Sequence, residues 1–314
     1  MKHDNNIFEN SIVCDITLPW VPEAQNKNQI LQRYKKSNFN FISLSVGVER
    51  MSIEQTIKYI KNVKKYIISK NDIIFVDSVK KIRAGYNKKL LCLGFHFQGS
   101  EMLAGKVSNV KKFYDLGIRH MLLAKDYRSK AAEGCYEDDD AGLSIYGRAL
   151  IKEMNINGMI LDLTHTGFNS TIEAMEISNK PVMFSHSNPY GLKKMKRNIN
   201  DEQIKKCAKK NGIIGIVGFG HFLKNNDISP NNFTNNIDYV SDLVGVKHIA
   251  LGLDYVYYKD QFLKQVKSNK FGLPKEYLKN MKGFNYVEPE SMIEVADILT
   301  KRNYTDKEIK GILG

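Results

Sequence analysis

Several polar residues with metal-binding chemistry follow short apolar runs along the chain. His96, His165 and His186 stand at the ends of three runs, and Asp15 and Asp254 stand at the ends of two others. Neutral imidazole and carboxylate are the ligands that zinc prefers in proteins. A metal held by residues from several runs would polarise a carbonyl group and supply hydroxide near neutral pH. These residues therefore predict a metal site that activates water.

The apolar runs that carry these residues predict a barrel. Eight runs, mostly of β-branched or aliphatic residues, alternate with helical patterns: 11–19, 39–47, 90–98, 118–124, 158–165, 181–186, 212–219 and 248–254. Strands that alternate with helices predict a parallel sheet, and eight of them predict a closed (β/α)8 barrel, or TIM barrel. An open doubly wound sheet is the alternative, but the segment DITLPW lacks the glycine-rich turn that usually follows the first strand of that fold.

A barrel of this kind gathers its chemistry at one face. The carboxyl ends of all eight strands meet at the same mouth, where the active sites of TIM barrels lie. Residues that end different runs are therefore expected to converge. We expect one domain over residues 1–314, with an elaborated loop after the eighth strand at about 255–290.

The helical patterns between the runs have recognisable ends. Segment 52–69 places its isoleucines on one stripe, and segment 144–158 ends at a glycine. Segment 170–180 begins with Ser170-x-x-Glu173, which predicts a capping box. The C-terminal segment is expected to be helical with a break near Asn303.

Several candidate residues also have a structural interpretation. His120 and His248 begin runs rather than end them, so we expect hydrogen-bonded structural roles for both. Asp162 differs in parity from His165 and is expected to be a structural carboxylate. His221, just past the seventh run, either lines the pocket or is structural.

Arg197 lies in the basic segment LKKMKRN, residues 192 to 198. One interpretation is a solvated helix start. The other is a planar guanidinium fork that binds the carboxylate of a substrate.

Composition excludes several classes of function. The formal net charge is +13, but the lysines are scattered and form no run of five or more, which disfavours a nucleic-acid partner. The four cysteines lie far apart and form no CxxC pair, so a disulfide framework and a zinc knuckle are not expected. The N-terminus is polar, and no apolar stretch approaches the roughly 18 residues of a membrane span. We therefore expect a cytoplasmic protein without a membrane partner.

Five segments together resemble a known family. They are LPW near the N-terminus, GLSIYGRALIKEMNINGMILDLTHTG, KPVMFSHSNPYGLKKMKRNINDE, VGVKHIALGLDY and the C-terminal YTDKEIKGILG. In this order they are similar to blocks of the membrane (renal) dipeptidase family, peptidase family M19. The resemblance implies a zinc-dependent dipeptidase on a barrel fold, often dimeric, with two metals.

The resemblance also implies roles for individual residues. His165 and His186 match two histidines of one metal site, and Asp254 matches the acid that contacts the attacking water. Arg197 matches an arginine that holds the substrate carboxylate, and we expect the adjacent Asn198 to bind substrate as well.

The chain departs from the family pattern at four places. Asp15 and Thr17 stand where the family has His-x-Asp, and His96 stands where it has a glutamate that bridges both metals. Lys125 replaces a histidine that helps to bind substrate. An imidazole offers one ligating nitrogen and cannot bridge two metals. We therefore predict one zinc on His96, His165 and His186, with Asp15 orienting His96.

A second metal bound by Asp15 is the alternative to that single-zinc site. The predicted function is zinc-assisted hydrolysis of an amide bond in a small, dipeptide-like substrate that carries a carboxylate, by a chain that could form a homodimer. A barrel that only binds ligands is one alternative, and a metal-dependent lyase or isomerase is another.

Overall fold

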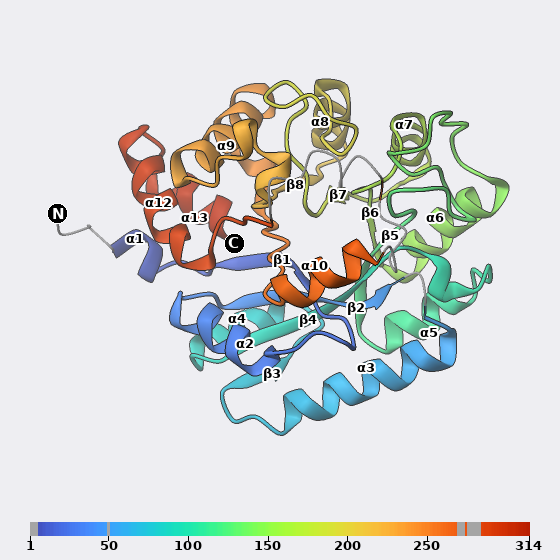
Figure 1. Cartoon of the computed structure of the whole chain (residues 1–314), viewed down its shortest axis with the longest axis horizontal. Coiled ribbons are helices and arrows are strands. Elements are labelled where there is room, and N and C mark those ends of the chain that lie inside the picture. The colour runs from blue at the N-terminus through green and yellow to red at the C-terminus, as the bar shows by residue number, and fades with distance from the viewer. Residues whose placement is uncertain (1–5, 49–50, 269–273, 275–283) are drawn as a thin grey trace.

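A parallel barrel forms the centre of the molecule, whose computed structural model describes residues 6–48, 51–268, 274 and 284–314 (Figure 1). The barrel strands are β1 (Cys14–Pro19), β2 (Phe41–Val48), β4 (Leu91–Gln98), β5 (Ile118–Leu122), β6 (Ile160–Asp162), β7 (Val182–Phe184), β8 (Ile213–Ile216) and β9 (Ile249–Leu251). They pair in that order, all in parallel. Each of the eight apolar runs overlaps one of these strands, and only β2 extends past its run, by one residue, so the predicted TIM barrel is confirmed.

A short additional strand, β3 (Ile73–Phe75), was missed from the sequence. It pairs with the first half of β4, while β5 pairs with the second half. The ring of Phe75 packs against Phe95, with ring centroids 4.8 Å apart. Three residues are too few to show a periodic pattern, so only the pairing with β4 defines this strand.

The seam between β9 and β1 is closed by a buried carboxylate. The Thr17 carbonyl accepts a hydrogen bond from the backbone N–H of Asp254 (3.1 Å). Oδ1 of Asp15 accepts from the backbone N–H groups of Thr17 (3.1 Å) and Leu253 (3.0 Å), and Oδ2 accepts from the Tyr34 hydroxyl (2.7 Å). Asp15 therefore joins the first strand to the end of the last one.

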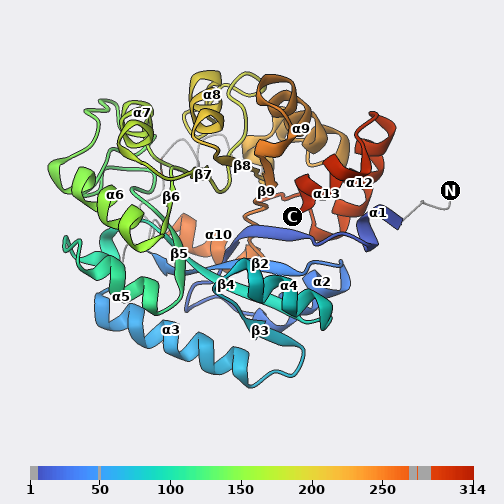
Figure 2. The same cartoon turned by 180° about the vertical axis from the view of Figure 1, so that it is seen from behind.

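Helices surround the barrel on the outside (Figures 1 and 2). They are α1 (Asn6–Glu9), α2 (Lys27–Lys36), α3 (Ile53–Ile68), α4 (Val79–Asn87), α5 (Asn109–Asp115), α6 (Ile145–Asn157), α7 (Phe168–Ile177), α8 (Asp201–Lys209), α9 (Pro230–Val244), α12 (Met292–Lys301) and α13 (Asp306–Leu313). The remaining described helix is α10 (Lys259–Lys267). α1 lies beside α12 and α13, so segments from both ends of the chain meet (Figure 2). None of the described helices is long and apolar enough to cross a membrane.

The helix ends largely follow the sequence signals. α6 ends at Gly158, whose φ of 76° suits glycine, and the chain breaks between α12 and α13 at Asn303, as predicted. The predicted capping box at Ser170 is wrong, because α7 already begins at Phe168. The Ser170 hydroxyl donates to Asp140 instead (2.8 Å).

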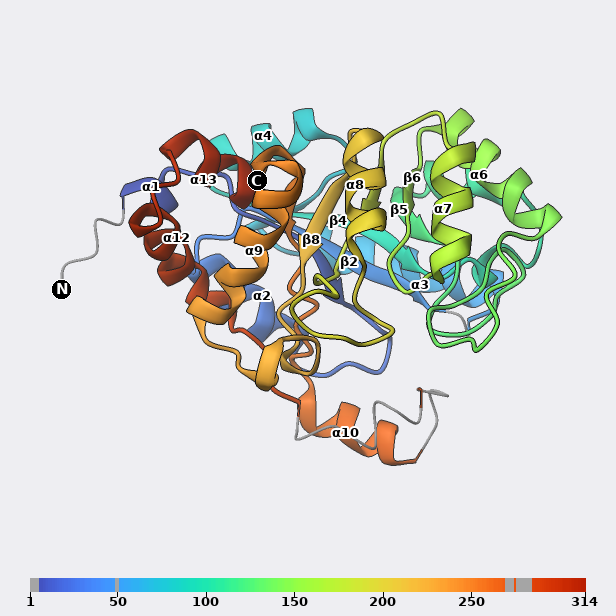
Figure 3. The same ribbon diagram turned by 90° about the horizontal axis from the view of Figure 1, so that it is seen from above.

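The predicted elaborated loop at 255–290 contains helix α10, which stands apart from the helices around the barrel (Figure 3). Residues 269–273 and 275–283 of this loop lie outside the described residues.

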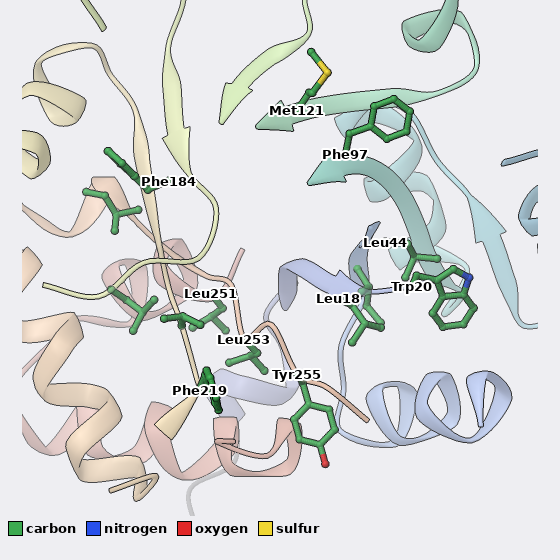
Figure 4. Packing of buried hydrophobic residues seen from close by; sticks show 14 of the residues in the cluster. Leu18, Trp20, Leu44, Phe97, Met121, Phe184, Phe219, Leu251, Leu253 and Tyr255 are labelled. Carbon is green, nitrogen blue, oxygen red and sulfur yellow. The ribbon is translucent and has the colours of Figure 1, made fainter. Parts of the chain in front are cut away.

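Apolar and polar side chains are sorted to opposite faces of the strands. On β4, Phe95 and Phe97 pack against Phe75 and Phe113 outside the barrel, with ring centroids 4.8 and 4.9 Å apart. His96, between them, faces the interior. Buried apolar side chains from β1, β2, β4, β5, β7 and β9 contribute to the core (Figure 4). Because successive side chains of a strand point to opposite faces, polar residues can occupy the barrel interior while apolar residues pack outside.

Asp15 provides a test of how the barrel is closed. Replacing Asp15 by Ala should lower the free energy of unfolding by about 2–4 kcal/mol, since buried donors would lose their acceptor. Asp15→Asn should cost no more than about 1 kcal/mol, because its amide oxygen can still accept the two backbone N–H bonds. Urea unfolding at pH 7.5 measures both values. Equal losses in the two variants would show that the charge, not the acceptor geometry, matters.

The pH dependence of the same variant supplies a second readout. Burial is the main reason that the pKa of Asp15 rises to about 7, although the bonds from Tyr34, Thr17 and Leu253 oppose this. An acid whose pKa is raised on folding binds its proton more tightly in the folded state. The wild type should therefore gain stability relative to Asp15→Asn as the pH falls from about 8 to 5.

Candidate active site

Three residues that follow barrel strands adopt a left-handed backbone. Asp126, His165 and Asp254 have φ values of 61°, 67° and 51°, and they follow β5, β6 and β9. Most other non-glycine residues with positive φ are asparagines, which tolerate this conformation. A left-handed side-chain-bearing residue costs on the order of 1–3 kcal/mol and persists where its surroundings impose it. Such residues collect at functional sites, and here they lie at one mouth of the barrel.

Two imidazoles face each other at this mouth. Nε2 of His165 and Nε2 of His186 lie 3.1 Å apart, and both side chains are buried. Nδ1 of His165 lies 2.8 Å from Oδ1 of Asp126. Burial raises the pKa of Asp126, but the electrostatic interaction and the hydrogen bond with His165 outweigh burial and lower the pKa, so the carboxylate is ionised. An ionised carboxylate only accepts, so His165 donates from Nδ1 and keeps a lone pair on Nε2.

A loop after β5 holds Asp126 and His165 in place. The backbone N–H of Tyr136 donates to the Asp126 carbonyl (2.8 Å), and that of Cys135 donates to the His165 carbonyl (2.7 Å). At Gly134 any Cβ would lie 2.3 Å from the Asp126 backbone, so only glycine fits there. The loop therefore imposes the left-handed backbone at both residues.

A chain of hydrogen bonds deeper in the barrel ends at His96. Oδ2 of Asp162 lies 3.1 Å from Nδ1 of His120, whose Nε2 lies 3.0 Å from the Ser43 hydroxyl. That hydroxyl lies 2.9 Å from Nδ1 of His96. Burial raises the pKa of Asp162, but bonds from His120 and Ser185 lower it overall.

The ionised carboxylate of Asp162 at one end determines where the protons of this hydrogen-bond chain lie. Since Asp162 accepts, His120 donates from Nδ1 and accepts at Nε2, so Ser43 donates to His120 and accepts from Nδ1 of His96. Nε2 of His96 then carries a lone pair. This nitrogen is buried and has no hydrogen-bond partner among the described residues. His120 and Asp162 thus have hydrogen-bonded placements of the structural kind expected from the sequence.

The buried histidines are neutral near pH 7. Burial, followed by the charge of Arg197, lowers the pKa of His165 to about 4 and holds that of His186 well below its usual range. The pKa of His96 is also lowered, by burial and then by His120 and Lys125. Neutral imidazole is the form that binds a metal.

Asp254 lies in a mixed electrostatic environment at the mouth. Burial raises its pKa to about 6, against the charges of Lys125 and Arg197, which lower it. The ammonium group of Lys125 donates to Oε1 of Gln98 (3.1 Å). Gln98 therefore belongs to this group of residues, although the sequence analysis assigned it no role; its parity with His96 on β4 was the available signal.

Comparison with known proteins agrees with this geometry. The model of the membrane dipeptidase family, peptidase family M19, matches residues 19–269. The chain belongs to this family. The family predicted from the sequence, and with it the class of metal-dependent hydrolases, is confirmed.

Individual relatives show how far the likeness extends. An uncharacterized dipeptidase of Schizosaccharomyces pombe is 22% identical over 98% of this chain and 71% of its own length. Dipeptidase aclJ of Aspergillus oryzae is 31% identical over 50% of this chain and 39% of its own. The crystal structure of an amidohydrolase from Pseudomonas aeruginosa has a TM-score of 0.90 at 26% identity and covers 98% of this chain and 95% of that one.

The M19 chain places two of its predicted ligands where one metal could bind both. Two ligands about 2.05 Å from a tetrahedral zinc lie roughly 3.3 Å apart, and the Nε2 atoms of His165 and His186 lie 3.1 Å apart. The lone pair and the missing partner of His96 Nε2 suit a third ligand. The donors therefore fit a metal, although among the described residues no group of three or more His, Cys, Asp or Glu side chains surrounds one point.

The structure commits Asp15 to the barrel seam. Both of its oxygens already accept hydrogen bonds from Thr17, Leu253 and Tyr34. This placement favours a structural role over the metal-binding or His96-orienting role predicted from the sequence.

Arg197 lies beside the paired histidines and is almost fully buried. Its Nη2 donates to the His186 carbonyl (2.7 Å), its Nη1 donates to the Ser187 hydroxyl (3.3 Å), and its Nε has no partner among the described residues. Arg197 and His165 line a cavity of about 320 Å³, which Asn198 also lines. A solvated helix start is thereby excluded.

Asn198 holds the loop that carries Arg197. Its side-chain amide donates to the carbonyls of Lys193 (2.9 Å) and Phe222 (3.1 Å), whereas its Oδ1 is buried without a partner in the described part of the chain. Any contact with substrate would therefore come from Oδ1.

Asp126 should control how tightly a metal is held. Asp126→Asn removes the ionised acceptor that fixes the His165 tautomer, so we expect a 10- to 100-fold loss of metal affinity. Competition with a chelator measures it. Asp138→Asn, which removes a fully exposed carboxylate from the same loop, is the control and should leave the affinity unchanged. Equal affinities for both variants would assign Asp126 no part in metal binding.

Proposed function

We propose that this M19 chain hydrolyses an amide bond in a small, dipeptide-like substrate that carries a carboxylate. The observation that supports this most strongly is the close approach of Nε2 of His165 to Nε2 of His186 (3.1 Å), because His165 lines the same cavity as Arg197. A group that binds a metal and a group that binds a carboxylate thus share one cavity, as cleavage of a short peptide requires.

The residues that would hold the metal are His165 and His186, with His96 as the third ligand. When bound, a zinc ion polarises the amide carbonyl and lowers the pKa of a bound water. Asp126 orients His165 through Nδ1, and the chain from Asp162 through His120 and Ser43 orients His96. These second partners fix which nitrogen of each ring is free to bind.

Asp254 is the proposed general base. At neutral pH it is ionised, since its pKa is about 6, and it can accept a proton from the attacking water. The positive charge of Lys125 stabilises the ionised carboxylate, and Gln98 accepts a hydrogen bond from Lys125. The same carboxylic acid can return the proton to the leaving amine, which completes hydrolysis.

Arg197 is the proposed partner of the substrate carboxylate, together with Lys125 and Asn198. The His186 carbonyl and the Ser187 hydroxyl hold the guanidinium in place, so little side-chain entropy is lost when an anion binds. Zinc as the metal, the cytoplasmic location and the homodimer stay predictions from the sequence.

Hydrolysis assays with a set of dipeptides test this function, and Asp254 gives the sharpest variant. Asp254→Asn keeps the shape of the side chain but removes the base, so kcat should fall by at least about 10²-fold. In the wild type, kcat/KM should fall as the pH drops through about 6, because Asp254 then becomes protonated. An unchanged kcat in the variant, or a wild-type profile flat from pH 5 to 8, would reject Asp254 as the base.

The number of bound metals provides an independent test. We expect one zinc per chain after mild dialysis, because Asp15 is committed to the seam and His96 offers a single nitrogen. Elemental analysis of the purified protein gives the ratio. Two ions per chain, or full activity without any, would contradict the single-metal site.

A further inference from the structure

A second, larger hollow adjoins the cavity that holds His165 and Arg197. Its volume is about 840 Å³, against about 320 Å³ for the cavity. Tyr190, Met195 and Lys196 line both, so the two hollows are contiguous. A ligand that reaches Arg197 can therefore extend into the larger hollow.

The charged side chains that line this hollow are positive. Lys193, Lys194, Lys196 and Lys224 line it together with His221, and no aspartate or glutamate is among the described residues that line it. Converging cations in a concave surface concentrate positive potential and favour an anionic ligand. Three of these lysines belong to the basic segment 192–198, and the fold places Lys224 beside them.

Two of the four lysines have their own partners within the protein. The ammonium group of Lys196 lies 3.0 Å from Asp138, whose side chain is fully exposed. Lys193 donates to the Leu223 carbonyl (2.9 Å) and to Oδ1 of Asn226 (2.8 Å), neither of which carries a charge. Its positive charge is therefore fixed in position but not neutralised.

The other two lysines carry charges that the protein leaves unpaired. In the part of the chain that the structure describes, neither Lys194 nor Lys224 forms an ion pair, and both are exposed at the rim. They come from different segments, the loop after β7 and the short turn after β8, so only the tertiary structure brings them to one hollow. These two cations and the fixed Lys193 line the same hollow, where their charges favour an anion.

We infer that this lysine-lined hollow binds a second anionic group of the substrate, a carboxylate or a phosphate, beyond the carboxylate that Arg197 takes. The inference rests on the proposed function, because it treats the neighbouring cavity as the place of amide hydrolysis. It makes the preferred substrates acidic or phosphorylated dipeptides rather than neutral ones.

Pairs of dipeptides that differ mainly in charge test the inference by binding alone. Glu-Ala with Gln-Ala, Ala-Glu with Ala-Gln, and phosphoseryl-alanine with Ser-Ala are titrated calorimetrically into the Asp254→Asn protein, which prevents turnover. The charged member of at least one pair should bind about tenfold more tightly, the effect expected of two or three partly exposed ion pairs. A preference confined to the glutamyl or to the phosphoseryl pairs identifies the anion.

Substitution of the unpaired lysines assigns the preference to this hollow. With Lys194→Gln and Lys224→Gln added, the affinity ratio should fall to about one. Lys152→Gln with Lys205→Gln removes the same charge from exposed positions on α6 and α8 that do not line the hollow, and should preserve the ratio. Added salt at about 0.5 M should reduce the affinity ratio between the charged and the neutral dipeptide, because exposed charges are screened.

The outcomes separate the inference from the proposed function. Equal affinity within all pairs, or a preference that survives the Lys194 and Lys224 substitutions, overturns the lysine-lined hollow as an anion site. A preference that these substitutions abolish supports it. If the metal-loaded wild type hydrolyses none of these peptides while the binding preference persists, the peptidase function fails and the anion site stands.

Discussion

A carboxylate removed from water must be hydrogen-bonded or paired, and three buried carboxylates of this barrel meet that requirement in ways on which the rest of the site depends. Asp15 accepts bonds across the seam and closes the barrel. Asp126 accepts from His165, and Asp162 accepts from His120. In the last two cases the acceptor also fixes the position of a proton, which leaves a lone pair on Nε2 of His165 and, through His120 and Ser43, on Nε2 of His96. The hydrogen bonds that stabilise the buried carboxylates of Asp126 and Asp162 therefore also prepare the metal site.

The same burial sets the protonation states that hydrolysis needs. Low polarity disfavours charge, so it lowers the pKa of His165 to about 4 and raises that of Asp254 to about 6. Neutral ligands and an ionised base then coexist at neutral pH. Arg197 and Lys125 add to the lowering of the His165 pKa and limit the rise of the Asp254 pKa, because a positive charge disfavours imidazolium and favours carboxylate. The cations that would bind substrate thus also tune the residues that would act on it.

Holding the site residues in place at the barrel mouth has an energetic cost, which the surrounding structure offsets. Asp126, His165 and Asp254 hold unfavourable backbone conformations, and backbone hydrogen bonds from the β5 loop and from the seam keep them there. The apolar side chains that β4 directs outward against β3 and α5 anchor the strand that carries His96. The outward face of each strand thus packs in the apolar core, and the inward face carries the polar residues of the site.

The sequence by itself determined the eight strands, the barrel and the family, because periodic burial and ordered motifs are local properties that a linear pattern records. It also placed His165, His186, Arg197 and Asp254 after strands. Only the tertiary structure decided that Asp15 closes the seam, that Gln98 joins Lys125 near Asp254, and that Lys224 lines one hollow with the lysines of segment 192–198. Those outcomes depend on hydrogen bonds and packing between segments far apart in the chain. Residue type and spacing do not encode which of two available partners a buried carboxylate takes.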